Sequence, residues 1–542
     1  MNSSNFVAKA LMGNQVTPPT SLLQGYDTFT GNGRSTALTG TTSTSGGAES
    51  SDYTTCTSLS SLTNSLKMSA ELSASGLFGS VDAKTDFLKS MNLTSTSVIV
   101  SIYANCGSVV TSCSNAQLNP NVAAPQADEL NQWYLGYGDS YVSSITTGAE
   151  YIACYVFYCQ STSEQTDITA QLSANGVTGA NQVSANVTSA LSSLQESVTT
   201  RTAFHQTLTG MTGIDLPTSE NIAAFALSFA SKTPNPGTIT NFTTTGYENA
   251  PGIGSVFAPI VETRNAFIAP LTNGGIGQTY QYLVSLNNAA AWLQDVYSTF
   301  GYNGDGVLIQ NSGQIVSDLS TVADAVTQIS QDATQVPSLP DLQSLSYGIP
   351  TINFSGPDPS SNPVTWGPPP PNNQNYESFQ DATYNSMLNQ TYLSSISLAG
   401  QYDTDDNLTM LYMVTLVFIS GDGNSQTVVH GVQTDGYPWS STDGLLFPPG
   451  SFVSNIVGAT LNSELPPGAI ASLAITSSGP NGSSISWPTG GDPNGDPPVT
   501  WNPANCEVLV GFSGQTCSGL LQNISPQVVI FSPANWIPNN GV

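Results

Sequence analysis

Two segments of this chain alternate apolar and polar residues, turn at a glycine-rich tip, and then alternate again. The first lies within 60–95 and turns at Gly76–Gly79, and the second lies within 163–200 and turns at Gly176–Gly179. Residues two apart share one face of a strand, so each segment predicts a β-hairpin with one apolar and one polar face. The apolar positions are Leu66, Met68, Leu72, Val81 and Phe87 in the first segment and Ile168, Leu172, Val183, Val187 and Leu191 in the second.

Each arm of these hairpins has the length that a tilted strand needs to cross a bilayer, about 9–11 residues. A strand between lipid and an aqueous lumen requires one apolar and one polar face. The pattern therefore predicts that both segments insert into a membrane. It leaves a second interpretation open, in which both are ordinary half-exposed strands of a secreted β-protein. No run approaches the ~20 apolar residues of a membrane-spanning helix.

Charged side chains are scarce, at 8% of the residues against about 25% in an average soluble protein. There are 8 Lys and Arg against 36 Asp and Glu, which gives a formal net charge of −28. Nucleic-acid binding requires clustered basic residues, so the composition excludes that class of partner. Attraction to anionic lipid is disfavoured for the same reason. A target surface is expected to be neutral lipid, a glycan or a protein receptor.

Between the two segments lies the run Tyr137-Gly138-Asp139-Ser140-Tyr141, followed by Gly148-Ala149. This run resembles the signature of the membrane attack complex/perforin (MACPF) superfamily, an aromatic-Gly-Thr/Ser-His-aromatic sequence followed by a pair of glycines. Upstream, Gly25-Tyr26-Asp27 resembles the entry to the first strand in that family. The chain departs from the signature at Ser140, where the family often has His, and at Ala149 in the glycine pair.

The resemblance implies an α+β fold for residues 1–355, with a bent antiparallel sheet flanked by helical clusters. In that family the two segments beside the signature are stored as helical bundles and unfurl during pore assembly. By the same resemblance, Gly138 and Gly148 would allow the sheet to bend, since glycine tolerates unusual backbone angles. Tyr137 and Tyr141 would pack at that bend.

Other stretches predict the elements around these segments. Ser97–Tyr103 and Tyr151–Tyr158 are rich in β-branched and aromatic residues and predict buried strands. Gln281–Val296 predicts a helix, and apolar residues repeat at helical spacing from Ile315 to Ile329. The proline-rich stretch 356–375 predicts a semi-rigid linker to a further domain.

Residues 376–542 show many strand-turn units and no helical pattern. The order Val508–Gly514, Gly519-Leu520-Leu521 and Val528–Phe531 resembles the end of a jacalin-related lectin, a β-prism of three sheets. That family holds sugar with a Gly-x-x-x-Asp loop, which implies a carbohydrate-binding loop at Gly519–Asn523, with Asn523 in place of the carboxylate. Trp439 is an aromatic residue that can stack on sugar. A purely structural or receptor-docking prism remains the alternative.

Seven cysteines without Cys-x-x-Cys spacing to histidines favour disulfides over a zinc site. The alternative is that most are small buried hydrophobes. Disulfides would indicate a secreted protein, although no signal peptide is visible because the N-terminal apolar run is too short. The predicted pairs are Cys106 with Cys113, Cys154 with Cys159, and Cys506 with Cys517, leaving Cys56 over.

Catalytic chemistry is not indicated. The two histidines, His205 and His430, have no pattern of nucleophile and base around them, so we predict that the protein is not an enzyme. No cofactor or protein-bound metal is predicted. Acidic turns such as Asp403–Asp406 offer oxygen ligands for a surface calcium ion without EF-hand spacing, and ordinary turns are the default interpretation.

The sequence therefore predicts a secreted pore-forming protein that docks through its C-terminal β-prism, assembles as a homo-oligomeric ring or arc, and inserts two hairpins per subunit. The alternative is a non-lytic structural or adhesive protein built on the same fold. A third interpretation is a lectin with an attached scaffold, which would bind sugar without affecting membranes.

Overall fold

The computed structural model describes residues 17–69, 83–159, 161–177, 179–183, 187, 190–191, 194, 201–269, 274–341, 345–356, 364–367, 369, 376–382, 387, 390–403, 408–420, 423–432, 439–460, 470–478, 482–487, 498–504 and 506–537. The chain divides into two compact units. The N-terminal unit comprises Met1–Ala291, Gln310–Thr351 and Trp536–Val542, and the C-terminal unit comprises Trp292–Ile309 and Ile352–Asn535.

The N-terminal unit is organised by a nine-stranded sheet whose two longest strands, β5 and β6, pair along most of their length. The strand order is β2-β1-β6-β5-β4-β7, with β3 on β5 and both β8 and β9 on β6. The predicted strands at Ser97–Tyr103 and Tyr151–Tyr158 are confirmed as parts of β5 and β6. The strands are β1 (Gln24–Asp27), β2 (Asn32–Thr36), β3 (Leu38–Gly46), β4 (Ser51–Cys56), β5 (Ser97–Leu118), β6 (Ser140–Tyr158), β7 (Ala180–Gln182), β8 (Arg201–Thr209) and β9 (Ile239–Gly246).

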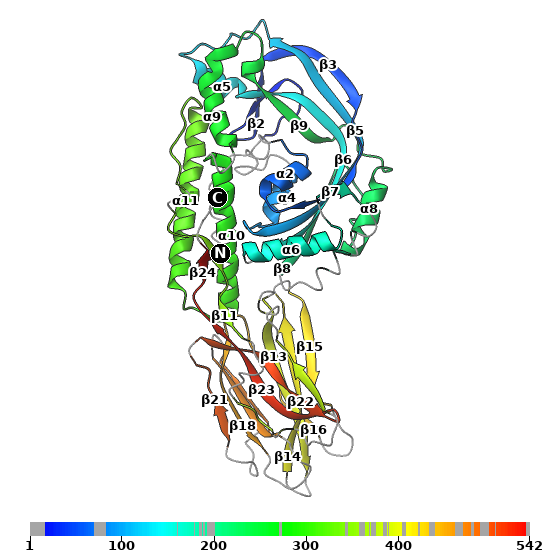
Figure 1. The fold of residues 1–542 in the computed structure, drawn as a ribbon, viewed down its shortest axis with the longest axis vertical. Coiled ribbons are helices and arrows are strands. Elements are labelled where there is room, and N and C mark those ends of the chain that lie inside the picture. The colour runs from blue at the N-terminus through cyan, green and yellow to red at the C-terminus, as the bar shows by residue number, and fades with distance from the viewer. Residues whose placement is uncertain are drawn as a thin grey trace. The chain divides into compact units, whose positions relative to one another are not determined.

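Helices cover both faces of this sheet (Figure 1). On one face, which we call the α2 face, α2 (Leu59–Ser65) and α4 (Ala83–Ser90) pack against Ile99, Tyr103 and Ile152. On the opposite face, which we call the α6 face, α6 (Thr162–Ala174) and α8 (Ile222–Phe229) pack on alternate strand residues such as Val100 and Tyr155. Because strand side chains alternate between faces, one run of residues supplies two separate cores.

The remaining helices include the two predicted from periodicity. α10 (Ile276–Thr299) and α11 (Gly306–Gln331) contain the stretches predicted at Gln281–Val296 and from Ile315. The apolar stripe of α11 is buried as expected for its spacing. The other described helices are α5 (Leu130–Tyr137), η1 (Ser219–Asn221), η2 (Tyr247–Asn249), η3 (Gly254–Phe257) and α9 (Ala258–Ile268). No helix within the described ranges is both long and apolar enough to cross a membrane.

The C-terminal unit is built on three long antiparallel hairpins, β13–β14, β18–β19 and β22–β23. Each hairpin has short strands on both of its edges. In the first hairpin β16 and β17 pair with β13, and β15 pairs with β14. In the second, β21 pairs with β18 and β20 with β19, and in the third, β11 pairs with β23 and β12 with β22. The first two hairpins are joined by a single described residue pair, Leu411 with Ile470. The four-stranded sheet around β22–β23 and the nine-stranded sheet that contains the other two hairpins enclose one core, and this arrangement of three hairpins makes the unit a β-prism.

The strands of the prism are β11 (Phe354–Ser355), β12 (Tyr376–Gln380), β13 (Tyr392–Asp403), β14 (Leu408–Ile419), β15 (Ser425–His430), β16 (Trp439–Ser441), β17 (Leu445–Leu446), β18 (Phe452–Thr460), β19 (Ile470–Ser478), β20 (Ser484–Trp487), β21 (Val499–Trp501), β22 (Glu507–Cys517) and β23 (Leu520–Phe531). Two further strands, β10 (Ile349–Thr351) and β24 (Asn535–Ile537), form a separate two-stranded sheet.

Part of the stretch predicted as a linker is built into the prism. Trp366 is 1% exposed, and its backbone N–H and C=O both bond to Ile524 at 2.9 Å. Its indole N–H donates to Val499 O at 3.0 Å. The prediction of a semi-rigid linker over 356–375 does not hold at this residue, because Trp366 is part of the core of the prism. Trp366 ends the run Pro-Val-Thr-Trp, and Trp501, which ends a second copy of that run, is likewise buried.

Candidate functional site

The two alternating segments occupy equivalent places in the N-terminal sheet. Residues 57–96 connect β4 to β5, and residues 159–200 connect β6 to β8. Both connections leave and re-enter at the same end of the sheet, because Ser97 pairs with Tyr158 and Tyr158 pairs with Arg201. Each segment thus joins two strands that are antiparallel neighbours. Their described helices are α2 and α4 in the first segment and α6 in the second.

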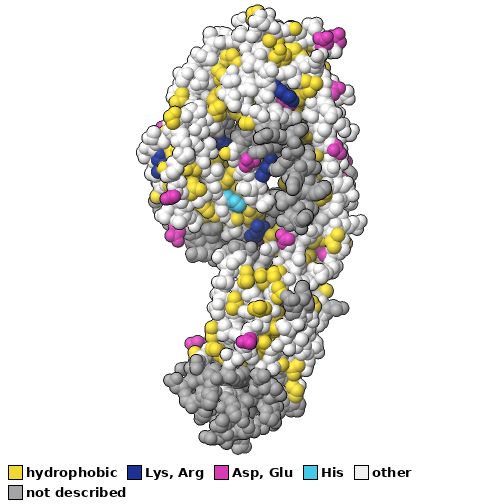
Figure 2. Space-filling view, turned by 180° about the vertical axis from the view of Figure 1, so that it is seen from behind, with side chains coloured by type: hydrophobic (Ala, Val, Ile, Leu, Met, Phe, Trp, Pro, Cys, Tyr) yellow, Lys and Arg dark blue, Asp and Glu magenta, His cyan; other side chains and the backbone are white. Residues whose placement is uncertain are grey.

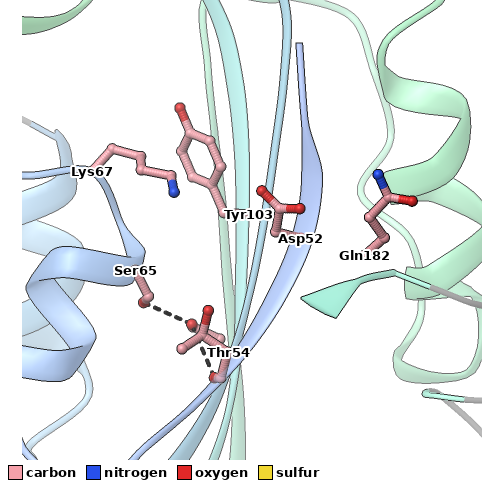
Figure 3. A pocket seen from close by; sticks show the side chains of 7 residues that line it. Asp52, Thr54, Ser65, Lys67, Tyr103 and Gln182 are labelled. Carbon is pink, nitrogen blue, oxygen red and sulfur yellow. Dashed lines mark hydrogen bonds between the residues drawn. The ribbon is translucent and has the colours of Figure 1, made fainter. Parts of the chain in front are cut away.

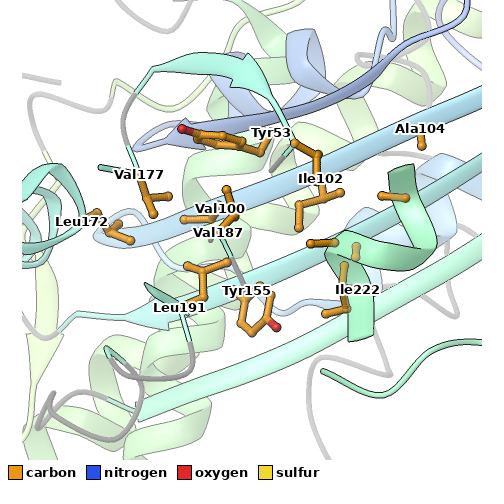
Figure 4. Close-up of a cluster of buried hydrophobic side chains, with 14 of the residues drawn as sticks. Tyr53, Val100, Ile102, Ala104, Tyr155, Leu172, Val177, Val187, Leu191 and Ile222 are labelled. Atoms are coloured by element: carbon orange, nitrogen blue, oxygen red, sulfur yellow. The ribbon is translucent and has the colours of Figure 1, made fainter. Parts of the chain in front are cut away.

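The apolar residues predicted to enter a membrane are buried against the sheet. In the first segment Leu66, Met68 and Phe87 lie in the α2-face core. The second-segment residues belong to the α6-face core: Ile168, Leu172, Val183, Val187 and Leu191. Figure 4 shows Leu172, Val187 and Leu191 of this set near Val100 and Tyr155 of the sheet. Leu72 and Val81 fall outside the described residues.

A buried ion pair fastens the first segment to the sheet. Lys84 Nζ of α4 lies 2.9 Å from Glu150 Oε2 of β6, and both side chains are 4% exposed. The Tyr103 hydroxyl donates to Glu150 Oε1 at 2.6 Å, and Lys84 Nζ also donates to Leu66 O at 3.1 Å. Burial, reinforced by Glu150, raises the pKa of Tyr103 far above its ordinary value, so the phenol stays a donor. We call Lys84, Glu150 and Tyr103 the buried triad.

A polar cavity of about 410 Å³ lies next to the buried triad on the α2 face. Figure 3 shows the Lys67 side chain beside the Tyr103 ring, with Asp52 and Gln182 on its other side. Ser101 Oγ donates to Ser65 Oγ at 2.7 Å, which ties α2 to β5 at the cavity wall. The interface between the first segment and the sheet therefore combines an apolar core with a polar cavity and a buried ion pair.

The second segment is held by backbone contacts along the edge of β4. Its short strand β7 pairs with β4, with Tyr53 opposite Asn181. Thr55 N donates to Gly179 O at 3.0 Å, and the Tyr53 hydroxyl donates to Gly176 O at 3.1 Å. β7 thus covers the outer edge of a strand that would otherwise present unpaired backbone groups.

The β5–β6 ladder is interrupted at closely packed glycines in or beside adjacent strands, and such an irregularity bends a sheet. Gly148 of β6 has φ +149°, and its place opposite Cys106–Val109 is an interruption in the β5–β6 register. A Cβ on Gly148 would lie 2.9 Å from Cys106 O, and one on Gly210 would lie 2.2 Å from Gly148 O. Gly107 also has positive φ, at +57°. Backbones therefore approach one another here more closely than any side chain allows.

Gly138 and the signature tyrosines lie elsewhere, so their predicted place at the bend is wrong. Gly138, at φ +84°, is the C-cap of α5, and a Cβ there would lie 2.2 Å from Tyr26 O. Tyr137 packs on Trp133, and Tyr141 packs on Tyr247, at the start of β6. Tyr141 and Gly148 are seven positions apart in β6, which is ~23 Å at 3.3 Å per residue.

The signature residues between them anchor a buried charge network. Asp139 is fully buried, and its carboxylate accepts from Thr28 N at 2.7 Å and from Thr28 Oγ1 at 2.8 Å. Arg264 Nη1 lies 3.6 Å from the same carboxylate. Burial raises the pKa of Asp139 to about 6, an effect that Arg264 opposes and Asp27 reinforces. Ser140 Oγ donates to Tyr26 O at 3.4 Å and has no contact with the bend.

The predicted sugar-binding loop is a tight turn followed by a strand. Ser518 and Gly519 have φ +50° and +84° and form the two-residue turn between β22 and β23. Leu521 and Asn523 are buried in β23, and Asn523 Nδ2 donates to Gln515 Oε1 at 3.0 Å. The prediction of a loop here is wrong, because the hairpin register continues to the turn. Trp439 lies in β16 opposite Gln401.

None of the three predicted disulfides is formed. Cys106 and Cys113 lie seven residues apart in β5, which is ~23 Å of extended chain against the 4.4–6.8 Å that a disulfide spans. The other pairs fail for the same reason. Cys154 lies in β6, which Cys159 directly follows, and Cys506 and Cys517 stand at opposite ends of β22. Among the seven, Cys113 and Cys506 are accessible and the others are buried.

Sequence reasoning missed the contacts of His430. Its Nε2 lies 2.5 Å from Asp381 Oδ1, and its ring stacks on Phe379 at 3.6 Å. Asp381 also accepts from Phe512 N at 2.8 Å, so the pair ties two sheets of the prism together. His430 and Asp381 lie far apart in the sequence, so no local pattern marks their contact. Within the described ranges no cluster of three or more His, Cys, Asp or Glu could hold a metal, and Asp405 and Asp406 fall outside those ranges.

Comparisons with known proteins find similarity in solved structures alone. No family model matches the chain, and no curated protein matches it. Calystegia sepium agglutinin is 17% identical and covers 33% of this chain and 97% of its own length, with a TM-score of 0.21. AcmJRL, a mannose binding jacalin related lectin from Ananas comosus, is 16% identical, covering 33% of this chain and 99% of its own, with a TM-score of 0.21. Frutapin, a lectin from Artocarpus incisa, is 18% identical, covering 33% and 96%, with a TM-score of 0.22. The three hairpins of this chain, and not these similarities, identify the C-terminal unit as a β-prism.

Proposed function

We propose that this protein is an extracellular pore-forming protein of the MACPF kind, whose two segments leave the sheet and insert into a bilayer as β-hairpins. The topology of the N-terminal sheet carries this proposal. Each segment already connects two antiparallel neighbours, so straightening it would lengthen both strands of an existing ladder. A helical hairpin between unrelated elements would have no ladder to extend.

The lengths of the segments are sufficient for this conversion. Residues 57–96 and 159–200 provide roughly 20 residues for each arm. At ~3.3 Å per residue an arm exceeds the ~30 Å of hydrocarbon that it would have to cross. Four arms from one chain would lie side by side, because β4, β5, β6 and β8 are consecutive in the sheet.

The C-terminal β-prism would dock the protein on its target surface. The whole chain has few basic residues, and they all precede residue 265. Figure 2 shows isolated basic spots on a surface of mainly uncharged side chains and backbone. A glycan, a protein receptor or zwitterionic lipid fits such a surface better than anionic lipid does.

A non-lytic assembly protein is the second candidate, and β3 favours it. Thr39–Gly46 of β3 are all exposed and uncharged, and among the described strands β3 pairs only with β5. Long uncharged edge strands readily pair with another chain. Such pairing would serve a ring of pore subunits and a structural polymer equally.

Release of dye from phosphatidylcholine vesicles, with the first segment locked, separates the two candidates. The Ser65→Cys/Ser101→Cys variant places two thiols where hydroxyl oxygens now lie 2.7 Å apart. Cys56 Sγ is 3.9 Å from Ser101 Oγ, so Cys56→Ala is included to prevent a competing bond. We expect release by the reduced variant and none by the oxidised one.

The single variant Ser65→Cys in the same background is the control, and its release should not depend on oxidant. Equal release from locked and unlocked protein would contradict insertion of the first segment. Ordered assemblies by electron microscopy without release from any vesicle would favour the structural candidate.

A further inference from the structure

We propose that both ladders extend in the membrane form without any change of register, so that the apolar residues of all four arms lie on the continuation of the α2 face. The partner of that face is the hydrocarbon of the bilayer, and the continuation of the α6 face lines the lumen. This inference rests on the proposed function, and it adds which side chains meet lipid and which residues stand next to one another.

The registers of the sheet fix the pairing that an unbroken extension would give. In β4–β5, Asp52 pairs with Tyr103 and Cys56 with Ile99, so residue n faces residue 155 − n. In β5–β6, Ser97 pairs with Tyr158, so residue n faces residue 255 − n. In β6–β8, Tyr158 pairs with Arg201, so residue n faces residue 359 − n.

Extending these three relations brings one apolar residue from each arm into a single row. Met68 faces Phe87, Phe87 faces Ile168, and Ile168 faces Leu191. Met68 and Phe87 are now buried on the α2 face, whereas Ile168 and Leu191 are buried on the α6 face. Residues stored in two cores on opposite sides of the sheet would thus meet on one side. We call Met68, Phe87, Ile168 and Leu191 the apolar row.

The rows beyond the apolar row follow the same division. Leu172 would face Val187 and Ala83 on the lipid side. The alternate positions are polar: Gln171 would face Lys84, and Thr169 would face Asp86. Lys84, which is now buried against Glu150, would therefore turn to the aqueous lumen.

The glycine-rich turns of the sequence agree with these registers independently. The β4–β5 relation puts the hairpin tip between residues 77 and 78, inside the Gly76–Gly79 turn. The β6–β8 relation puts the second tip between residues 179 and 180, at the end of the Gly176–Gly179 turn. A slip of one residue would reverse the faces of a whole arm.

The apolar part of the extended arms also has the length needed to cross the hydrocarbon layer. On the side toward the sheet, the row of Leu66 would contain Lys89 and Thr166, so the apolar band begins at the apolar row. From Met68 to the turn at Gly76 the arm provides 9 residues. A tilted strand crosses the hydrocarbon layer with about 9–11 residues.

Some residues of α6 are exposed in the helix but would lie on the lipid face of a strand, so they distinguish the two forms. Ile168 and Leu172 are buried in α6, whereas Ala170, Gln171, Ser173 and Ala174 are exposed. A helix buries residues about 3.6 apart, but a strand puts every second residue on one face. In the membrane form Ala170 and Ala174 would therefore join the lipid face, and Gln171 and Ser173 would stay in water.

The test is an environment-sensitive nitrobenzoxadiazole label on single cysteines introduced at these four exposed positions. Cys113 and Cys506, the two accessible native cysteines, are first replaced by serine. With phosphatidylcholine vesicles we expect emission from Ala170→Cys and Ala174→Cys to rise several-fold and to be quenched by nitroxide-labelled lipid. Gln171→Cys and Ser173→Cys are the matched controls and should stay unchanged.

The possible outcomes separate the register from the proposed function. The expected parity is a rise in emission at residues 170 and 174 and none at residues 171 and 173. Dye release with a rise at residues 171 and 173 instead, or with the same response at all four labels, would overturn the register but not pore formation. No release and no change at any label, both in phosphatidylcholine vesicles and in vesicles of a total cell-lipid extract, would overturn the proposed function and this inference with it. Release with the expected parity supports both.

Discussion

Lys84 is a cation held inside the protein by one carboxylate and one carbonyl oxygen. Removing either member of a buried ion pair leaves the other charge without compensation, which commonly costs 3–5 kcal/mol. Here Lys84 belongs to the first segment, which is proposed to move, and Glu150 belongs to the sheet, which stays in place. The ion pair joins the two. The pair therefore links the stability of the soluble form to the retention of the first segment.

We expect Lys84→Met to lower the free energy of unfolding by about 3 kcal/mol, because Glu150 would remain buried with only Tyr103 as its partner. Urea unfolding measures this change. The double variant Lys84→Met/Glu150→Gln should be more stable than Lys84→Met alone. Lys67→Met is the matched control, since Lys67 belongs to the same segment and also lies near Tyr103 but is exposed. Equal losses in Lys67→Met and Lys84→Met would argue against the ion pair.

Asp139 gives the second prediction at the residue scale. Burial raises the pKa of Asp139 from 3.8 to about 6, so between these values the folded protein holds a proton that the unfolded chain releases. The contribution of this group to the free energy of unfolding therefore increases as the pH falls through 6 and levels off below 3.8. Its full size is on the order of 3 kcal/mol.

The Asp139→Asn variant should lose this dependence, which urea unfolding at several pH values between 7 and 4 would reveal as a flatter profile than that of the wild type. Asp128→Asn, at an exposed position, should keep the wild-type profile. An unchanged profile in Asp139→Asn would show that another group titrates.

At the scale of elements, the bend depends on backbone contact between β5, β6 and β8. Gly148 lies where the β5–β6 register is interrupted, and its neighbours leave no room for a side chain. The bend separates the part of β6 that pairs with β9 from the part that pairs with β8. The second segment follows the part of β6 that pairs with β8, and the first segment enters β5 beside it, since Ser97 pairs with Tyr158. The bend therefore sets the direction in which both segments would extend.

Gly148→Ala should destabilise the protein by about 1–3 kcal/mol, because the new Cβ would lie 2.9 Å from Cys106 O at a φ of +149°. Thermal unfolding followed by circular dichroism measures the effect. Gly136→Ala is the control: Gly136 lies in α5 with nothing within 4 Å of its Cβ position, and alanine there should be neutral or slightly stabilising. A neutral Gly148→Ala would mean that the strands can move apart at the bend.

At the scale of the whole molecule, the charge balance governs which surfaces the protein can approach. A net charge of −28 with only 8 basic residues gives long-range repulsion from anionic membranes. Several of these basic residues form ion pairs within the protein: Lys84 with Glu150, Arg34 with Asp27 and Arg264 with Glu248. Little positive charge remains for a surface to attract.

We expect binding to vesicles to weaken as phosphatidylserine replaces phosphatidylcholine, and added salt to reduce the difference because it screens the repulsion. Cosedimentation at low and high salt measures both effects. Stronger binding to the anionic vesicles would contradict this prediction.

The sequence by itself determined the features that depend on local pattern. Periodicity identified β5, β6, α10 and α11, because one buried face imposes its spacing on the residues of an element. Alternation marked the two segments, and composition excluded nucleic acid as a partner. The strand-turn pattern after residue 376 indicated an all-β unit, and the resemblance of Val508–Phe531 to jacalin-related lectins implied the β-prism that the three hairpins form.

Only the tertiary structure decided which distant residues meet. The cysteine pairs failed because spacing along the chain does not tell whether two residues share one extended strand or face each other across two. Gly138 does not lie at the bend because it caps the C-terminus of α5, before β6 begins. The buried triad and the Asp139 network join residues from separate elements, so no local pattern marks them. The apolar row needs both levels: the sequence supplies the alternation, and the ladders supply the register that aligns four arms.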